Sequence, residues 1–464
     1  MENKKSLIIN SICIFLFAIT TLIILLHHEV WADEAQAWLV VRDLDLFGII
    51  KHVRTEGHPL LWYYVLLPFA KSGLPIMSMQ ILNWLVVVVS VGVLFFKSPF
   101  NFFSKLAVAS SSGFLYWYAA TARSYCFIPL FMFLLAVFYQ KQKEHPFIYA
   151  LLVIMLANTH VIMLGFCTAL AVIFLWNNRD KKSITAAALM FASFACITLY
   201  LWGSQNENII VKIAQPLPFP QNIIHALDRS IFNLYGSVNW FYTAVFYIFT
   251  ACAAIITAFK NRQMLFIYTF STLFQFAVYV YVWGQLPQRI YTLFFVIMFC
   301  FWVMFKDFDN KLKITTNLLI MLAFCSTLPC GFELIKQDMQ KSFSDGERVA
   351  KFIKKHIPED AFIVSNYPLT TVAISAYLPQ NKGKWRFFYQ GYNDYYTFSK
   401  WDKNISPSFA PVPLAEYLKH RKDIYVIMSA GSFYDDIIPI YASSDKVFNN
   451  QEKFSIYHVV KKTN

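Results

Sequence analysis

The sequence has few charged residues for its length. Asp, Glu, Lys and Arg make up 14% of its 464 residues, whereas a soluble domain usually carries about 25%, which argues against a chain that is soluble throughout. Paired cysteines are also missing, because the eight cysteines form no CxxC motif and none follows Cys330. This spacing excludes a disulfide framework and a zinc-binding cysteine cluster. The sequence contains no internal repeat and no low-complexity tract.

Apolar residues are abundant and occur in long runs. Hydrophobic residues make up 57% of the chain, with 47 Phe, 26 Tyr and 12 Trp. A helix needs about 20 consecutive apolar residues to cross a bilayer. Lipid offers the backbone no hydrogen-bond partners, so a spanning segment forms its backbone hydrogen bonds within its own helix. The sequence therefore predicts an α-helical polytopic membrane protein with about eleven spans. The expected spans are 6–27, 76–96, 106–121, 124–140, 147–160, 161–176, 184–202, 239–259, 264–283, 290–305 and 314–330.

The basic residues indicate how these spans are oriented. The formal net charge is +13, but most Lys and Arg residues before residue 331 lie in short connectors between apolar runs. The connectors between spans two and three, four and five, six and seven, eight and nine, and ten and eleven fall on one side, together with Lys4 and Lys5. By the positive-inside rule this side is cytoplasmic, so the charge is an orientation signal and not a nucleic-acid surface. We expect a multi-pass inner or plasma membrane protein with a cytoplasmic N-terminus, a membrane domain over 1–330 and an extracytoplasmic domain over 331–464.

Three segments on the outward side are longer than turns. In the first, 28–75, the stretch 59–69 predicts a helix lying at the interface, with Trp62, Tyr63 and Tyr64 suited to the headgroup level. The second, 203–238, contains Pro216, Pro218 and Pro220, which form an extended stretch that cannot be helical. The third is the tail, where Ser344-Asp345-Gly346-Glu347 has the spacing of a capping box before an amphipathic helix. The tail has strand signals at 361–364, 385–389, 424–428 and 454–460, so a small α/β domain is expected.

Two adjacent carboxylates, Asp33 and Glu34, follow the first span directly. Acidic pairs in loops are most often solvated without further function. Here the flanking Trp31 and Trp38 hold the pair at the membrane surface, where a carboxylate needs a reason to be. On a helix the two side chains would diverge by about 100°, so only one of them can reach a given substrate.

Four further polar clusters fall on the same predicted side. They are Glu56-Gly57-His58-Pro59, Thr121-Ala122-Arg123-Ser124-Tyr125, Asn158-Thr159-His160 and Pro287-Gln288-Arg289-Ile290-Tyr291. Arginines that snorkel to the interface and a buried, hydrogen-bonded histidine would explain each cluster on its own. Their occurrence on one side favours a shared site, in which the two arginines bind a lipid phosphate.

The order of these motifs resembles a known family. An Asp-Glu pair after the first span, His58-Pro59-Leu60-Leu61-Trp62-Tyr63, Ala-Arg-Ser-Tyr after the third span and Gln-Arg-Ile-Tyr leading into a later span look like the GT-C membrane glycosyltransferases. The branch that they resemble contains the protein O-mannosyltransferases and the lipid A aminoarabinose transferases. Many relatives carry Pro-Pro or Lys-Pro where this chain has His58-Pro59, so a phosphate-binding lysine cannot be carried over and His58 stands in its place.

The resemblance implies an inverting transfer of a sugar from a polyprenyl-phosphate donor to a glycan, lipid or protein acceptor on the outer face. A phosphate leaves without an acid, so one base suffices, and cations offset the charge on the departing phosphate. The resemblance assigns Asp33 as the base and Glu34 as a supporting acid. Phosphate contacts are expected from His58, Arg123, Arg289 and Tyr291, with Glu56, Tyr125 and His160 as further candidates for the site. Some relatives use a divalent metal ion, for which Glu34, His58 and His160 are candidate ligands.

Three other functions remain open from the sequence, and one of them is a structural or sensory membrane protein whose tail binds a partner. A transporter or flippase for lipid-linked sugars would also place arginines and carboxylates at the membrane, but such proteins usually show repeated halves or broken helices. A polysaccharide polymerase or ligase would also have many spans and outward arginines. Such an enzyme would not need an Asp-Glu pair directly after the first span.

Overall fold

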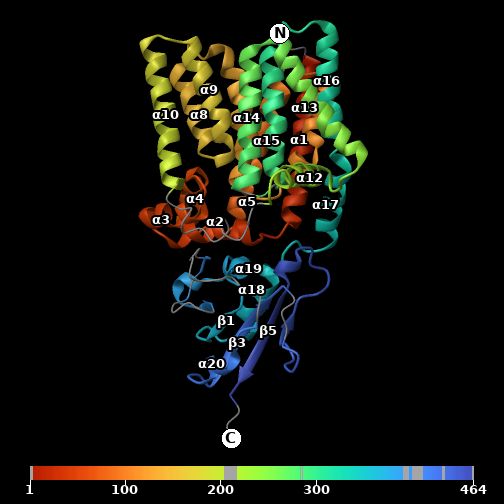
Figure 1. Ribbon diagram of the computed structural model, residues 1–464. Coiled ribbons are helices and arrows are strands. Elements are labelled where there is room, and N and C mark those ends of the chain that lie inside the picture. Colours follow the sequence, from red (N-terminus) through yellow and green to blue (C-terminus); the bar gives the residue numbers. More distant parts are fainter. Residues whose placement is uncertain are drawn as a thin grey trace.

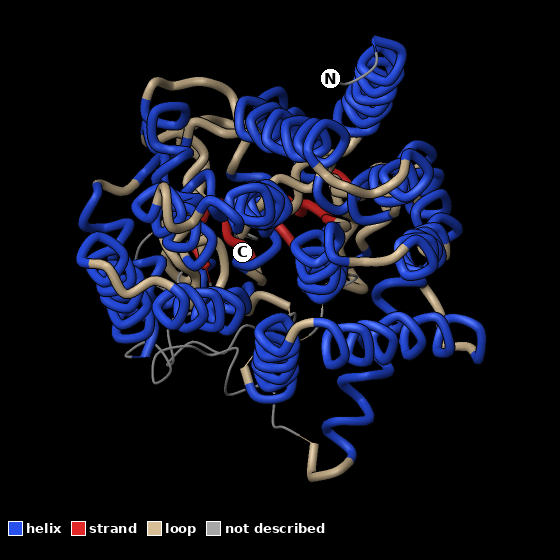
Figure 2. Tube along the Cα trace, turned by 90° about the horizontal axis from the view of Figure 1, so that it is seen from above, coloured by secondary structure: helices blue, strands red, loops and turns tan. Residues whose placement is uncertain are grey.

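The computed structural model describes residues 4–202, 217–282, 284, 286–389, 395, 397–399, 411–430 and 434–461. A bundle of long helices forms one layer, and a small α/β domain forms the other (Figure 1). The N-terminus lies at the end of the bundle that faces away from this domain. Viewed along the long axis, the strands lie behind the centre of the helical layer (Figure 2).

Eight helical stretches are long and apolar enough to cross a membrane, among the residues that the structure describes. They are α1 (Lys4–His27), α5 (Met77–Lys97), the stretch Ser124–Lys141 around α7 (Phe127–Phe138), α10 (Lys181–Trp202), α13 (Trp240–Lys260), α14 (Arg262–Tyr281), the stretch Pro287–Asp307 that begins with α15 (Pro287–Met304), and α16 (Asn310–Cys325) followed by α17 (Leu328–Gln340). The predicted polytopic helical fold is therefore confirmed.

The three remaining predicted spans are shorter or interrupted helices. The expected spans 147–160 and 161–176 correspond to α8 (Pro146–Ala157) and α9 (Leu164–Asn177), which are separate helices as expected. The expected span 106–121 consists of α6 (Phe102–Ser110) and a π-helical turn, η1 (Gly113–Tyr118). Every residue of α15 is buried, as expected of a helix that is apolar on all sides and surrounded by other helices.

Short helices cover the end of the bundle that faces the α/β domain. These are α2 (Ala32–Asp43), α3 (Leu46–Glu56) and α4 (Leu61–Lys71), which lie between the two layers in Figure 1. The helix predicted over 59–69 is therefore present as α4, and its position at the membrane interface stays a prediction. In the second outward segment, residues 203–216 lie outside the described residues, and α12 (Gln221–Tyr235) begins directly after Pro220.

The C-terminal domain contains one five-stranded sheet in the order β2-β1-β3-β5-β4. Its strands are β1 (Ile363–Ser365), β2 (Phe387–Tyr389), β3 (Asp423–Ser429), β4 (Tyr441–Ala442) and β5 (Phe454–Val460), and its helices are α18 (Gly346–His356), α19 (Pro368–Ser375) and α20 (Leu414–Leu418). Strand β1 is parallel to β2 and β3, whereas β5 is antiparallel to β3. All four predicted strands are confirmed.

The start of α18 differs from the predicted capping box. The N-cap is Asp345 and not Ser344, and Asp345 makes no side-chain capping bond. Its carboxylate instead pairs with Arg348 in the same helix at 2.8 Å and accepts a hydrogen bond from the Tyr441 hydroxyl of β4 at 2.7 Å. An ion pair within the helix and one contact with a distant strand therefore take the place of the local cap. The predicted domain boundary at residues 330 and 331 falls within α17, and it stays a prediction.

Candidate active site

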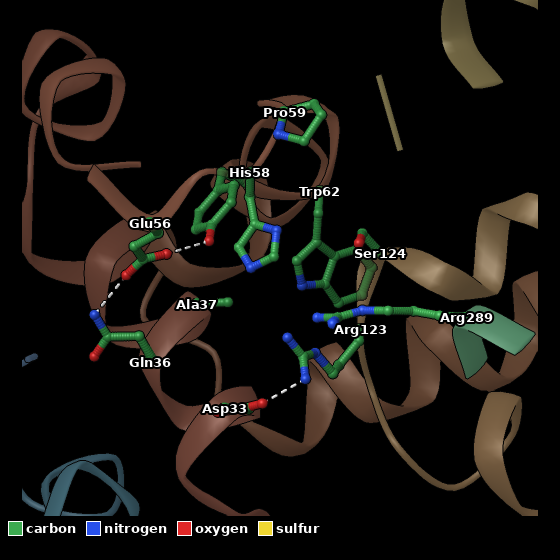
Figure 3. A pocket seen from close by; sticks show the side chains of 11 residues that line it. Asp33, Gln36, Ala37, Glu56, His58, Pro59, Trp62, Arg123, Ser124 and Arg289 are labelled. Carbon is green, nitrogen blue, oxygen red and sulfur yellow. Dashed lines mark hydrogen bonds and ion pairs between the residues drawn. The ribbon is translucent and has the colours of Figure 1, made fainter. Parts of the chain in front are cut away.

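A cavity of about 130 Å³ lies between α2, α4 and the first turn of α15. We call it the bundle cavity. It brings together side chains from four of the five predicted polar clusters (Figure 3). The predicted members that line it are Asp33, Glu56, His58, Arg123 and Arg289. Segments that are far apart in the sequence therefore form one site at the end of the bundle.

Asp33 lies in the first turn of α2, where the positive end of the helix dipole favours an anion. Its carboxylate forms an ion pair with the Arg123 guanidinium, as Figure 3 shows. Burial opposes the charge on Arg123, but the adjacent Asp33 carboxylate raises the pKa of Arg123 above its usual value. The Asp33 side chain remains 45% exposed, whereas the Arg123 side chain is only 13% exposed. The carboxylate is therefore the accessible member of the pair.

Glu34 points away from the cavity, as the 100° divergence on a helix predicts. Its buried carboxylate accepts a hydrogen bond from the Ala122 amide at 2.5 Å. It also lies 3.4 Å from Nε2 of His28. Because Ala122 directly precedes Arg123, Glu34 anchors the segment that carries this arginine. This geometry favours a positioning role for Glu34.

His28 compensates the buried charge of Glu34. Its Nδ1 lies 2.8 Å from the Asp338 carboxylate on α17. Burial lowers the pKa of His28, but hydrogen bonds to Asp338 and Glu34 outweigh this effect and raise it to about 10. The imidazole is therefore cationic and joins α2 to the last helix of the bundle.

Arg289 approaches the cavity from the first turn of α15. Its Nε donates to the Tyr125 hydroxyl at 2.8 Å, and its terminal nitrogen donates to the Gly284 carbonyl at 2.5 Å. The guanidinium of Arg123 lies 5.5 Å from the centre of the Tyr125 ring. Tyr125 thus contacts both arginines without lining the cavity itself, and the two guanidiniums point toward one another in Figure 3.

The two predicted histidines lie next to each other, but only His58 lines the cavity. The ring of His160 lies 5.6 Å from that of His58 and 5.0 Å from that of Tyr125. Nδ1 of His160 accepts from the Ile162 amide at 3.2 Å, so His160 supports the site from behind. Burial, reinforced by the charge of Arg123, lowers the pKa of His58 to about 4. His58 is therefore a neutral imidazole, not a cation, at neutral pH.

Glu56 is the second carboxylate of the cavity, and its oxygens are already engaged. It accepts from Gln36 at 2.6 Å and from the Tyr63 hydroxyl at 2.5 Å, and it lies 3.0 Å from Nε2 of His52. Burial raises the pKa of such an acid, but these partners outweigh burial and lower it to about 2. Glu56 is therefore a fixed anion.

Three lining residues were missed or misplaced from the sequence. Gln36 lies one turn after Asp33 on α2, a spacing that points both side chains the same way. Trp62 and Tyr63 were expected at the headgroup level but are only 3% and 4% exposed, whereas Tyr64 is 38% exposed. The aromatic triplet thus contributes two of its three rings to the interior and one to the surface.

Tyr291 does not line the bundle cavity, contrary to its expected contact with phosphate. Two residues along a helix correspond to a rotation of about 200°, so Tyr291 faces away from Arg289. Its hydroxyl lies 2.7 Å from the Ser112 hydroxyl. The ring packs so tightly on the π-helical turn that a Cβ on Gly113 would lie 2.8 Å from it. Tyr291 therefore fastens α15 to η1.

The residues considered as metal ligands do not form one group. Glu34 faces Ala122 and His28, whereas His58 and His160 face each other. Within the described ranges, no three His, Cys, Asp or Glu side chains are placed to hold a metal ion. These three residues therefore do not fit a common metal site.

No protein-family model matches the sequence, and no curated protein matches it either. Among the solved structures that match it, two do so over nearly its whole length. The crystal structure of ArnT from Cupriavidus metallidurans in the apo state has a TM-score of 0.56 and 10% identity, and the match covers 96% of this chain and 97% of that chain. The crystal structure of ArnT from the same organism bound to undecaprenyl phosphate has a TM-score of 0.58 and 9% identity, and it covers 97% of both chains.

These identities are low, so the similarity shows the fold alone. ArnT is a lipid A aminoarabinose transferase with a GT-C fold. The chain therefore has the same fold as these two ArnT structures, and the resemblance drawn from the motif order is confirmed at the level of the fold.

Proposed function

We propose that the chain is an inverting membrane glycosyltransferase that takes a sugar from a polyprenyl-phosphate donor. The observation that carries this proposal is the convergence of Arg123 and Arg289 beside the accessible carboxylate of Asp33. Two guanidiniums suit a phosphate group. The ArnT structure bound to undecaprenyl phosphate supports a lipid phosphate as the ligand for this fold.

The ion pair between Asp33 and Arg123 suggests how donor binding prepares the base. The donor phosphate competes with Asp33 for Arg123, so donor binding weakens the hold of Arg123 on the carboxylate. Arg289 remains fixed by Tyr125 and supplies the second cation. Both guanidiniums then stabilise the charge that develops on the departing phosphate.

In the transfer step, the acceptor hydroxyl oxygen attacks the anomeric carbon on the face opposite the phosphate. The new carbon–oxygen bond forms as the bond to the phosphate oxygen breaks, and the hydroxyl proton passes to Asp33. The phosphate leaves with the electron pair of the broken bond, so no general acid is needed. Attack on the opposite face inverts the anomeric centre.

Asp33 is a better base than Glu56, the other carboxylate of the cavity. Glu56 is buried and held by three partners, and its pKa is lowered to about 2. Asp33 is 45% exposed and has Arg123 as its salt-bridge partner. A base must reach the hydroxyl that it deprotonates, and only Asp33 combines exposure with a partner that the donor can draw away.

Transport of lipid-linked sugars is the less favoured function. Substrate sites of transporters lie near the bilayer midplane, whereas the bundle cavity lies at the end of the bundle next to α2, α3 and α4. We further propose that this end faces the outside of the cell. A reporter that is active only outside the cytoplasm, fused after Lys461, should be active. Activity of a cytoplasmic reporter at this point would contradict the orientation.

The donor proposal is tested by titrating the purified protein with undecaprenyl phosphate and following Trp fluorescence. Arg289→Ala should weaken binding by about 10-fold to 100-fold, which corresponds to about 1–3 kcal/mol for hydrogen bonds to a charged group. Arg229→Ala is the matched control, because Arg229 is an exposed arginine on α12. Equal affinity of all three proteins would contradict the proposed donor site. Mass spectrometry of cell-envelope glycans from cells with and without the gene would then identify the transferred sugar.

A further inference from the structure

A second cavity, of about 210 Å³, lies between α2 and the C-terminal domain. We call it the interdomain cavity. The bundle side contributes Trp31, Asp33 and Gln36, and the C-terminal domain contributes residues near α19 and β5. Asp33 and Gln36 line both cavities. The proposed base is therefore accessible from two sides.

The two cavities differ in charge. Asp33 and Glu452 are the acidic side chains of the interdomain cavity, and no Lys or Arg lines it within the described part of the chain. The other polar lining groups are hydroxyls and amides, such as those of Thr370, Asn449 and Gln451. An anionic ligand would meet the Asp33 carboxylate here, and no Lys or Arg among the described lining residues would attract it into this cavity. An apolar ligand would leave the polar groups unpaired, which is costly.

Glu452 contributes a buried polar group to this cavity. Glu452 is only 1% exposed, although it is far from α2 in the sequence. Its Oε1 accepts from the Ala32 amide at 3.1 Å and from the Asn449 side chain at 3.0 Å. Its Oε2 has no hydrogen-bond partner among the residues that the structure describes. Burial raises the pKa of Glu452 to about 8, so at neutral pH the carboxyl is largely protonated and can donate.

We propose that the interdomain cavity binds the acceptor as a neutral carbohydrate and directs one of its hydroxyl groups to Asp33. Carbohydrate hydroxyls both donate and accept, and they therefore match a lining of amides, hydroxyls and a carboxyl group. The sugar donor occupies the bundle cavity with its phosphate on the arginines, and the acceptor approaches Asp33 from the opposite side. This inference rests on the proposed function and adds the chemical class of the acceptor.

Glu452 also positions the base. The first turn of a helix has amide groups without partners inside the helix, and the N-cap residue of α2 makes no side-chain capping bond. Glu452 supplies an acceptor for Ala32, the residue directly before Asp33. The C-terminal domain thus holds the helix that carries Asp33 and forms one wall of the acceptor site.

The test measures binding of three sets of probes to the purified full-length protein by saturation-transfer NMR. The probes are neutral oligosaccharides, the same oligosaccharides carrying a phosphate or a uronate, and serine-containing peptides. Binding of at least one neutral oligosaccharide is expected, with the anionic counterpart at least 10-fold weaker. Preference for the anionic counterparts, or binding of peptides alone, would overturn the proposal.

Substitutions in the interdomain cavity test whether the oligosaccharide binds there. Gln451 is an exposed residue that lines the cavity, so Gln451→Trp should block the cavity without disturbing the core. It should abolish oligosaccharide binding, whereas Ser444→Trp, at an exposed position elsewhere in the domain, should not. Glu452→Gln keeps a neutral donor and should retain binding better than Glu452→Ala. Unchanged binding by Gln451→Trp would place the carbohydrate elsewhere and overturn the proposal.

Undecaprenyl phosphate binding is measured on the same proteins and should be the same in wild type and Gln451→Trp. If the wild type did not bind undecaprenyl phosphate, this result would contradict the proposed donor site itself. Normal lipid binding without oligosaccharide binding would contradict only the acceptor inference. The two failures are therefore distinguishable.

Discussion

The bundle cavity and the interdomain cavity share Asp33 and Gln36 but differ in the charge of their other lining residues. The bundle cavity contains two guanidiniums and a fixed carboxylate, whereas the interdomain cavity contains carboxyl, amide and hydroxyl groups. The first is walled by helices of the membrane layer, and the second is walled partly by the C-terminal domain. A transferase binds two different substrates. Here the difference in charge between the two cavities favours the anionic lipid donor in the bundle cavity and the neutral acceptor in the interdomain cavity.

The largest effect is expected at the residue that both cavities share. Asp33→Asn keeps the size of the side chain but removes the proton acceptor. Loss of a general base costs about 10²–10⁴ in rate. The measurement is sugar transfer by purified protein, or the restored glycan in cells that carry the variant gene.

The same variant separates chemistry from donor binding. Asn at position 33 cannot hold Arg123 in an ion pair, so undecaprenyl phosphate should bind to Asp33→Asn at least as tightly as to the wild type. Transfer at the wild-type rate would rule out Asp33 as the base. Weaker lipid binding would show that Asp33 does not compete with the phosphate for Arg123.

A smaller effect is expected in the bundle cavity from a change that keeps the charge. Arg289→Lys replaces a planar group that donates to Tyr125 and Gly284 with a point charge that cannot do both in the same geometry. We expect undecaprenyl phosphate binding to weaken by about 1–3 kcal/mol, while oligosaccharide binding in the interdomain cavity stays unchanged. Titration of both ligands against one protein preparation checks the contrast. Equal loss of both ligands would mean that the two cavities are not independent sites.

The smallest effect concerns Glu452 and pH. Its pKa rises from 4.5 to about 8 on folding, chiefly through burial. A carboxyl group whose pKa is higher in the folded than in the unfolded protein contributes fully to the free energy of unfolding below its unfolded pKa. This contribution is lost as the pH rises through its folded pKa. Glu452→Gln mimics the protonated acid at every pH. The wild type should therefore lose thermal stability relative to this variant between pH 5 and pH 9, by on the order of a few °C.

A melting series of both proteins in the same detergent checks this expectation. A constant difference in Tm across the pH range would mean that Glu452 does not change its protonation between the folded and unfolded states. It would also remove the reason for treating the carboxyl as a hydrogen-bond donor in the interdomain cavity.

The sequence predicted the elements that depend on local patterns. Each membrane helix has its own apolar run, and each of the strands predicted in the tail has its own β-rich run, so both were found without tertiary information. All five polar clusters were predicted to share one side, and residues of four of them line one cavity. His160, from the fifth, lies directly behind His58.

The misses depend on contacts between distant segments. Tyr291 was expected beside Arg289, but α15 turns it toward Gly113, and no local pattern reveals that neighbour. Gln36 and Glu452 carry no motif, and they become functional candidates only because the chain folds the C-terminal domain against α2. The charge state of His58 also depends on burial and on Arg123, neither of which can be read from its place before Pro59.

Gln36 has a consequence for the order of events in the reaction. Its amide nitrogen donates to Glu56 in the bundle cavity and to the Ser399 carbonyl of the C-terminal domain, and its oxygen accepts from the Ser399 amide. A ligand in one cavity that breaks the hydrogen bonds of Gln36 on that side also changes the hydrogen bonds of Gln36 on the side of the other cavity. Thermodynamic linkage makes such an effect reciprocal. If the donor alters the affinity for the acceptor by some factor, the acceptor must alter the affinity for the donor by the same factor, and a single amide side chain is the place to look for that cooperativity.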